Sequence, residues 1–283
     1  MNPAFTDAHV HFWDLRALTY PWLAELPAIS GVHTPAELRA EAADYLPDRI
    51  VFVQCGGNEE HWQDEVTWVE ALAAAEPRIA GIVAYIPVNA GIATTQAIAD
   101  LKNRPLVRGV RHLVQGQADP HFCLQPEFVA GVRQLGEAGL SFDLCCLHPQ
   151  LPAVTELVRR CPGTSFILDH AGKPGIRARL LDPWRSDIAA LAALPNVVSK
   201  FSGLVTEADP AAWKLDDLQP YATHLLATFG PSRLLFGSDW PVVKLAGDYL
   251  RWLGTARALL SHLSSADRDA IFRANTLRIY RLN

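Results

Sequence analysis

The N-terminal stretch FTDAHVHFWD places two histidines, His9 and His11, one residue apart. The stretch is otherwise apolar enough to form a buried strand. Because side chains alternate along a strand, we expect both imidazoles, together with Asp7, on one face. Such a pair is either part of a polar edge or the first half of a reactive site, and residues elsewhere in the chain must decide between the two.

More reactive side chains follow apolar runs elsewhere in the chain: Gln54, Arg111, His112, His148, His170, Lys173 and Asp239. Imidazole nitrogens and a carboxylate oxygen suit Zn²⁺ or a similar cation. Without a metal, the same groups can polarise a carbonyl while the carboxylate activates water. Both arrangements lead to hydrolysis, or to addition of water, at an electrophilic carbon.

Eight short apolar runs rich in strand-forming residues could position these groups, at 5–13, 49–57, 79–88, 107–115, 140–148, 164–172, 196–204 and 233–241. Segments with helical apolar spacing lie between them, at 33–46, 59–76, 88–104, 125–139, 151–161, 182–194, 215–230 and 247–263, and a last one lies at 265–280. In the first of these, Thr34, Pro35 and Glu37 predict a capped helix start.

Strands that alternate with helices predict parallel βαβ units, and eight units predict a (β/α)8 TIM barrel with an extra C-terminal helix. We expect one domain over residues 1–283. The alternative, a doubly wound nucleotide-binding sheet, requires a glycine-rich loop after the first strand, where this chain has HFWDLRALTYPW. In a barrel the reactive residues lie at the C-terminal ends of the strands, where the histidines and Asp239 fall.

The long loop after the first strand carries Trp13, Tyr20 and Trp22. These aromatic residues either form a lid or pocket wall or simply pack over the barrel mouth. Lys200, on the seventh run, either lines the pocket or is a solvated charge, and we favour the pocket.

Composition narrows the classes of function. The formal net charge of -5 and the pI near 6 exclude a clustered basic face for nucleic acid. We expect no membrane span and no signal peptide, and we expect a cytoplasmic protein. The five cysteines are spaced irregularly, without a CxxC motif, and are expected to be reduced and mostly buried. The sequence leaves open whether the protein is a monomer or a homo-oligomer.

Four motifs in this order, DAHVHFWD, LDHAGKP, KFSGLVTEA and LLFGSDWPV, resemble the amidohydrolase superfamily and its amidohydrolase-2 branch. The resemblance extends from Asp7 to Trp240. That branch includes lactonases of sugar acids such as L-fuconolactone and L-rhamnonolactone, and enzymes that open 2-pyrone-4,6-dicarboxylate or sulfomuconolactone.

The resemblance implies that His9, His11 and His170 polarise a carbonyl and that Asp239 is the general base. The superfamily's two-metal sites use a carboxylated lysine on a middle strand, and VRGVRHLVQ offers none. The resemblance therefore implies no essential cofactor. A single Zn²⁺ or other divalent cation, bound without being required, would be held by these same four residues.

The resemblance implies a hydrolase that opens a small sugar-acid lactone. The expected substrate-binding residues are Trp22, Gln54, Arg111, His112, His148, Lys173 and Trp240. A sugar lactone is favoured over a dicarboxylate because only Arg111 is a well-placed arginine. Two alternatives stay open: a metal-dependent decarboxylase or hydratase of the same superfamily, and a catalytically silent barrel that binds sugar acids.

Overall fold

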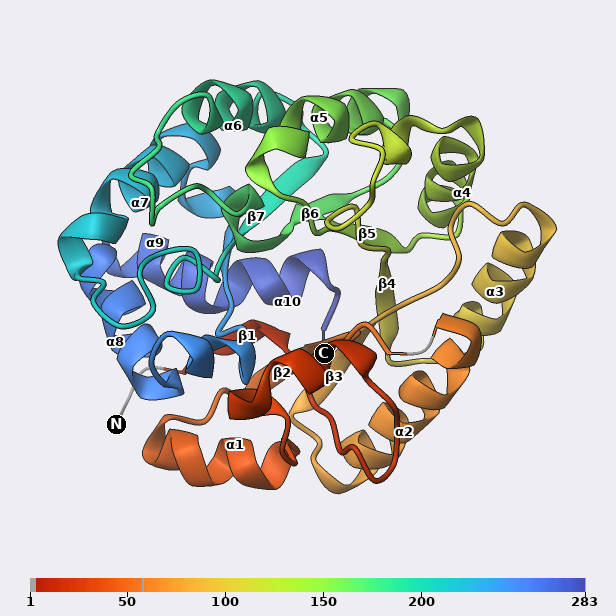
Figure 1. The fold of residues 1–283 in the computed structure, drawn as a ribbon, viewed down its shortest axis with the longest axis horizontal. Coiled ribbons are helices and arrows are strands. Elements are labelled where there is room, and N and C mark those ends of the chain that lie inside the picture. The colour runs from red at the N-terminus through yellow and green to blue at the C-terminus, as the bar shows by residue number, and fades with distance from the viewer. Residues whose placement is uncertain (1–3, 58, 283) are drawn as a thin grey trace.

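The computed structural model describes residues 4–57 and 59–282. Eight parallel strands pair in sequence order into one barrel, and Figure 1 shows them inside a ring of helices. This confirms the (β/α)8 prediction. The strands are β1 (Thr6–Val10), β2 (Arg49–Val53), β3 (Ile79–Ala84), β4 (Val107–Arg111), β5 (Ser141–Leu144), β6 (Phe166–Leu168), β7 (Val197–Phe201) and β8 (Leu234–Phe236).

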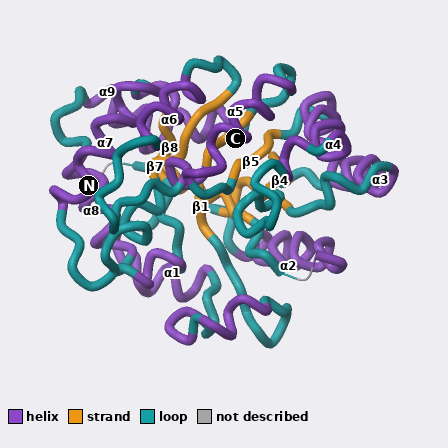
Figure 2. The backbone as a smooth tube through the Cα atoms, turned by 45° about the horizontal axis from the view of Figure 1, so that its top comes forward, coloured by secondary structure: helices purple, strands orange, loops and turns teal. Residues whose placement is uncertain are grey.

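The helices cover the outside of the barrel, and Figure 2 shows strands enclosed by helices. They are α1 (Pro35–Ala42), α2 (Trp62–Ala75), α3 (Ile92–Lys102), α4 (Pro126–Glu137), α5 (Leu151–Arg160), α6 (Trp184–Ala192), α7 (Leu215–Phe229), α8 (Tyr249–Leu259), α9 (Ser265–Asp269) and α10 (Asn275–Ile279). The expected C-terminal helix is present, but a π-helical turn at Ala270–Ala274 divides it into α9 and α10. Among the described helices, none is both long and apolar enough to cross a membrane.

The hydrophobic core has two parts, one on each side of the barrel wall. Most apolar residues of the strands face outward and pack against the helices in one large cluster. A smaller cluster fills the barrel interior, and it includes Ala8, Val53, Val83, Ile167 and Tyr280. Tyr280 follows α10, which lies across the barrel in Figure 1, so the C-terminal segment supplies part of the inner core.

Strand β1 is irregular where the histidines begin. Asp7 pairs with Ile50 and Val10 pairs with Phe52, so three steps along β1 match two along β2. One extra residue in a strand is a β-bulge, and it breaks the alternation of side chains. The expectation that Asp7 shares a face with both histidines is therefore wrong. Its carboxylate instead accepts hydrogen bonds from the backbone N–H of His9 and of Ser238, at 3.1 and 2.8 Å.

The barrel closes at a seam between β1 and the residues that follow β8. Val10 pairs with Trp240 in a parallel bridge. The backbone N–H of Asp239 donates to the carbonyl of His9 at 2.8 Å, and that of His11 donates to the carbonyl of Trp240 at 2.7 Å. Backbone hydrogen bonds at this seam thus fix Asp239 beside the two histidines.

Two local predictions are confirmed. Helix α1 begins with Thr34 as its N-cap, and Glu37 completes the capping box. All five cysteines are free and buried.

Candidate active site

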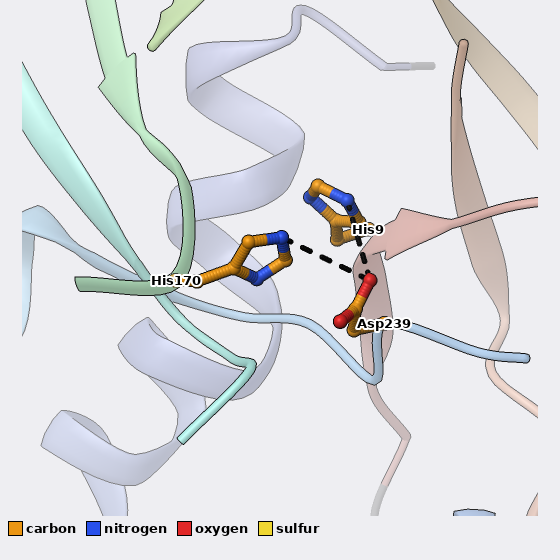
Figure 3. A group of neighbouring side chains, drawn as sticks. All are labelled: His9, His170 and Asp239. Atoms are coloured by element: carbon orange, nitrogen blue, oxygen red, sulfur yellow. Dashed lines mark ion pairs between the residues drawn. The ribbon is translucent and has the colours of Figure 1, made fainter. Parts of the chain in front are cut away.

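The carboxylate of Asp239 lies among three imidazoles at the C-terminal mouth of the barrel. Its Oδ1 is 3.4 Å from Nε2 of His11, 3.6 Å from Nε2 of His9 and 3.8 Å from Nε2 of His170. The Nε2 atoms of His9 and His11 are 3.1 Å apart. Figure 3 shows His9 and His170 converging on Asp239 from separate strand ends. The structure thus brings together the four residues that the motifs singled out.

Unusual backbone conformations aim His170 and Asp239 into the site. Both adopt positive φ, at 51° for His170 and 60° for Asp239, a region that costs most side chains energy. His170 lies in the turn after β6, and its Nδ1 is 2.9 Å from the hydroxyl of Ser202. Gly203 backs the same ring so closely that a Cβ there would lie 2.6 Å from His170. A glycine at 203 is thus a condition for the position of the imidazole.

A buried ion cluster lies on the barrel side of His9. Lys200 on β7 has no exposed surface, and its Nζ is 2.6 Å from Oδ2 of Asp143 and 2.9 Å from Oδ1 of Asp169. The hydroxyl of Tyr280 donates to the same Asp143 oxygen at 2.6 Å. Lys200 also lies 3.0 Å from Nδ1 of His9. It is therefore neither a solvated charge nor a pocket-lining residue, but a contact of a site histidine from behind.

Burial and neighbouring charges set the protonation of the site. Burial would raise the pKa of Asp239, but the adjacent imidazoles outweigh it and hold that pKa well below its usual range. Burial lowers the pKa of His170 to about 4, and it also lowers the pKa of His11. Burial and the charge of Lys200 hold the pKa of His9 well below 6.5. At neutral pH the site is therefore an ionised carboxylate among neutral imidazoles.

Donor atoms of three site residues fit a single tetrahedral zinc ion. Metal–ligand bonds of about 2.0–2.1 Å place tetrahedral donors roughly 3.3 Å apart. Oδ1 of Asp239 lies 3.6–3.8 Å from Nε2 of His9 and of His170, and one donor atom from each of these three residues falls within a 4.8 Å group. His9, His170 and Asp239 are therefore the described residues that would hold a divalent cation, whereas His11, also expected as a ligand, is not a member of this group.

Arg111 lies at the site, where both terminal nitrogens of its guanidinium contact protein groups and its buried Nε has no hydrogen-bond partner among the described groups. Nη1 donates to Oδ2 of Asp169 at 3.0 Å, and Nη2 donates to the carbonyl of Gln54. Gln54 is also buried, and its side-chain oxygen accepts from the N–H of Gly56. Arg111 thus braces the ends of β2, β4 and β6, rather than presenting a free guanidinium to a ligand.

Lys173 lies at the rim of the site. It follows His170 in the same turn, and its Nζ is 4.0 Å from Glu207. Burial would lower the pKa of Lys173, but the surrounding anionic groups, Asp239 among them, raise it instead. Lys173 is therefore a cation near Asp239, as its predicted role in substrate binding requires.

Two other expected substrate-binding residues point away from the histidines. His112 packs among the rings of Tyr85, Phe122 and Phe128, with centroids 5.2–5.6 Å away. The role of His148, which lies beside Gly175 in the segment after Lys173, stays a prediction. Trp240 is fully buried and donates to Glu41 at 3.0 Å, so it has no surface for a substrate. The prediction that Trp240 contacts the substrate is therefore wrong, because the chain reverses after Asp239 and the indole points outward.

A pocket opens beside the histidines and Asp239, over the ends of β2 and β3. Its lining includes Gln54, Glu59, Glu65 and Tyr85, together with residues of the aromatic loop such as Tyr20. Tyr20 donates to Glu65 at 3.1 Å, which fixes the loop to the pocket wall. Both alternatives for this loop hold in part, since Tyr20 lines the pocket whereas Trp13 is buried packing.

Trp22 holds the loop onto the end of β2. Its indole N–H donates to the carbonyl of Cys55 at 2.7 Å, and its ring packs edge-to-face on Trp13. Cys55 is next to Gln54 in sequence, and its Sγ lies 3.7 Å from Nδ1 of His11. The pocket wall and the histidine cluster therefore share the end of β2.

Comparison with known proteins gives this arrangement a family. The amidohydrolase family model matches residues 6–282. An L-fucono-1,5-lactonase of Burkholderia multivorans is 35% identical in an alignment that covers 98% of this chain and 95% of the relative. The chain belongs to the amidohydrolase family.

Two further relatives of this amidohydrolase match along nearly its whole length. An L-fucono-1,5-lactonase of Burkholderia ambifaria is 32% identical and covers 98% of this chain and 95% of the relative. The crystal structure of an amidohydrolase from Burkholderia multivorans with bound zinc superposes with a TM-score of 0.89 at 32% identity. That match covers 99% of this chain and all of the other.

Several residues of this amidohydrolase's site were not expected from the sequence: Asp143, Asp169, Ser202, Gly203 and Tyr280. Asp143 and Asp169 carried a usable signal, because a carboxylate inside an apolar strand is costly unless it is paired. The partners lie on other strands or at the C-terminus, so spacing along the chain could not assign them.

Replacing Gly203 with alanine should displace His170. Alanine at a φ of 65° costs about 1–2 kcal/mol, and its Cβ would collide with the imidazole. Gly139→Ala is the control, since its φ is 75° and nothing lies within 4 Å. Thermal unfolding should show a larger loss for Gly203→Ala than for Gly139→Ala, because the collision adds to the backbone cost. Crystal structures should show His170 farther from Asp239 only in Gly203→Ala, and an unmoved ring there would contradict the steric role of Gly203.

Glu65 should make stability fall as pH rises. Burial raises its folded-state pKa from 4.5 to about 7, so the folded protein keeps a proton that the unfolded chain releases between these values. Glu65→Gln preserves the acceptor oxygen and cannot ionise. The difference in free energy of unfolding between Glu65→Gln and wild type should therefore shift in favour of the variant by roughly 3 kcal/mol from pH 4 to pH 8. Urea unfolding measures this, with exposed Glu127→Gln as control; a constant difference would refute the assignment.

Proposed function

We propose that this amidohydrolase opens a sugar-acid lactone to its aldonic acid. One observation carries the proposal: an ionised carboxylate, Asp239, lies 3.4–3.8 Å from three imidazoles at the mouth of the barrel. That arrangement suits activation of water beside a polarised carbonyl. The L-fucono-1,5-lactonases that match at 32–35% identity over nearly the whole chain support the substrate class.

In the proposed reaction Asp239 takes a proton from water, and the oxygen of that water attacks the lactone carbonyl carbon. The imidazole of His170, which keeps 4% exposure, donates its Nε2–H to the oxyanion that forms, while His9 and His11 lie beside Asp239 and support the site from behind. The carbon–ring-oxygen bond then breaks, and the proton held by Asp239 passes to the leaving ring oxygen. Water and lactone thus become one hydroxy acid. Lys173 is placed to attract its new carboxylate.

The pocket beside the cluster favours a neutral, hydroxylated ring. Its described lining includes the carboxylates Glu59, Asp64 and Glu65 and contains neither lysine nor arginine. Glu59 accepts a hydrogen bond from the hydroxyl of Tyr85 at 2.7 Å, which leaves further oxygen lone pairs for sugar hydroxyls. A dicarboxylate or sulfonate would meet like charge here. We therefore assign the sugar hydroxyls to this pocket.

A bound divalent cation would act at this site as a Lewis acid for the carbonyl oxygen. The residues that would hold it are His9, His170 and Asp239. All the proton transfers in the proposed reaction use Asp239 and water, so the proposal keeps the metal non-essential.

The first experiment follows acid release with a pH indicator while the purified protein meets a panel of aldonolactones, L-fucono-1,5-lactone among them. Each sample is tested with and without prior chelation, and its zinc content is measured. The proposal predicts that at least one lactone is hydrolysed with acidification of the solution, and that this activity survives chelation. Silence across the panel would refute lactone hydrolysis. Activity lost on chelation and restored by zinc would refute the non-essential metal and favour the metal-dependent alternative.

Asp239→Asn should abolish turnover and keep the fold. The amide retains the shape and one acceptor oxygen, but it cannot hold the water proton, so we expect kcat to fall by at least about a hundredfold. The loss should appear in kcat more than in KM. Asp100→Asn, on the exposed face of α3, is the matched control and should keep near-normal kcat. A near-normal rate for Asp239→Asn would remove the core of the mechanism.

A further inference from the structure

Lys200 faces the rear nitrogen of a site histidine. Its Nζ makes aligned hydrogen bonds to Oδ2 of Asp143 at 2.6 Å and to Nδ1 of His9 at 3.0 Å. Asp169 Oδ1 lies 2.9 Å from the same ammonium and 3.3 Å from Nδ1 of His9, but no described group donates an aligned hydrogen bond to it. Lys200, held between two carboxylates, is therefore the hydrogen-bond partner of Nδ1.

A backbone carbonyl determines which ring nitrogen of His11 carries the hydrogen. Its Nδ1 lies 2.7 Å from the carbonyl of Val53, which can only accept, so Nδ1 carries the hydrogen. In the neutral ring Nε2 is then a lone pair. That lone pair faces Nε2 of His9 at 3.1 Å.

These contacts form a chain with a single direction. An ammonium can only donate, so Nδ1 of His9 accepts from Lys200 and the ring proton of neutral His9 resides on Nε2. The Nε2–H of His9 then donates to the lone pair of His11, whose Nδ1–H donates to Val53. Every donor in this chain meets an acceptor.

The other tautomer of His9 satisfies fewer groups. A proton on Nδ1 would face the ammonium of Lys200 and would reach only Oδ1 of Asp169, at 3.3 Å and without an aligned hydrogen bond. Two lone pairs would then oppose each other 3.1 Å apart at the Nε2 atoms. Arg111 does not repair this, because its Nη1 is 3.5 Å from His9 but 3.0 Å from Asp169, to which it donates. The Nε2–H tautomer is therefore the one that this environment selects.

We infer that Lys200 is a positioning residue that fixes His9 as a hydrogen-bond donor toward the site and thereby weakens His9 as a metal ligand. Metal-binding histidines ordinarily donate their second ring N–H to a carboxylate or carbonyl, which leaves the other nitrogen free to bind the metal. In this site a cation occupies that place, and the nitrogen that would bind the metal carries the proton. Zinc that binds to His9 must therefore displace a proton, and the positive charge of Lys200 repels it.

The inference deepens the proposed function in one respect only, because it explains how the residues of a lactonase site can work without a tightly held metal. The tautomer and the metal affinity are measured without any lactone. The two proposals can therefore fail separately. The lactone panel can be silent while this inference stands, and this inference can fail while lactone hydrolysis is observed.

A charge-balanced variant tests the inference. Lys200→Met combined with Asp143→Asn removes one buried cation and one buried anion, and it leaves Asp169 to accept from Nδ1 of His9. The control combines Asp143→Asn with Tyr280→Phe, which alters the same cluster and keeps Lys200. Circular dichroism and thermal unfolding establish that both variants are folded. Equilibrium dialysis against Zn²⁺, followed by elemental analysis, then gives the zinc dissociation constant.

The Lys200→Met, Asp143→Asn variant should bind zinc more tightly than wild type by on the order of tenfold or more, the usual size of such effects. The control should stay near the wild-type affinity. In metal-stripped samples the first variant should lose kcat with little change in KM. Unchanged or weaker zinc binding in the folded variant would overturn the inference.

Nitrogen NMR on the wild-type protein tests the same point without relying on a buried substitution. The ¹⁵N chemical shifts of His9, assigned by comparison with His9→Gln, distinguish a protonated ring nitrogen from one with a free lone pair. The inference requires a lone pair on Nδ1 and a hydrogen on Nε2. The reverse assignment would overturn it, including in the case that the double variant does not fold.

Discussion

The site depends on one ammonium buried between two carboxylates inside the barrel. Lys200 has no exposed surface, and neither do Asp143 and Asp169. Burying such charges is costly unless each is paired, and removing one partner of a buried pair typically costs about 3–5 kcal/mol. The cluster therefore specifies how β5, β6 and β7 face one another. It also places a fixed positive charge directly behind His9.

This cluster also ties the end of the chain to the site. Tyr280 follows α10, fills the barrel interior and donates to Asp143. On the other side, the seam between β1 and the residues after β8 fixes Asp239 by a backbone hydrogen bond to His9. Asp239 and His9 are thus held from two directions, by the closing seam and by the charged interior. Neither device uses the loops that shape the pocket.

Sequence patterns predicted the barrel because alternating strands and helices have few stable parallel arrangements. They also brought His9, His11, His170 and Asp239 to one mouth, since the C-terminal ends of all strands meet there. The bulge at β1 could not be predicted, because one extra residue leaves the apolar pattern readable and still moves Asp7 to the opposite side. Strand-end position alone does not give side-chain direction.

The same limit explains the residues that point elsewhere. His112 follows Arg111 by one residue at the end of β4, so it faces the opposite way from Arg111 and packs among the rings of Tyr85 and Phe128. Trp240 follows Asp239 and is directed outward in the same manner. The pairing of Lys200 with Asp143 and Asp169 joins residues from three strands, and no local spacing in the sequence encodes it.

The central claim is that water held by Asp239 attacks the acyl carbon of a lactone. Enzymatic hydrolysis in ¹⁸O-labelled water, with mass spectrometry of the hydroxy acid, tests this most directly. Attack at the acyl carbon predicts one labelled oxygen per turnover, located in the new carboxylate and absent from the hydroxyl derived from the ring. Label in that hydroxyl would place the attack on the ring carbon instead, and it would contradict the proposed roles of Asp239 and the histidines.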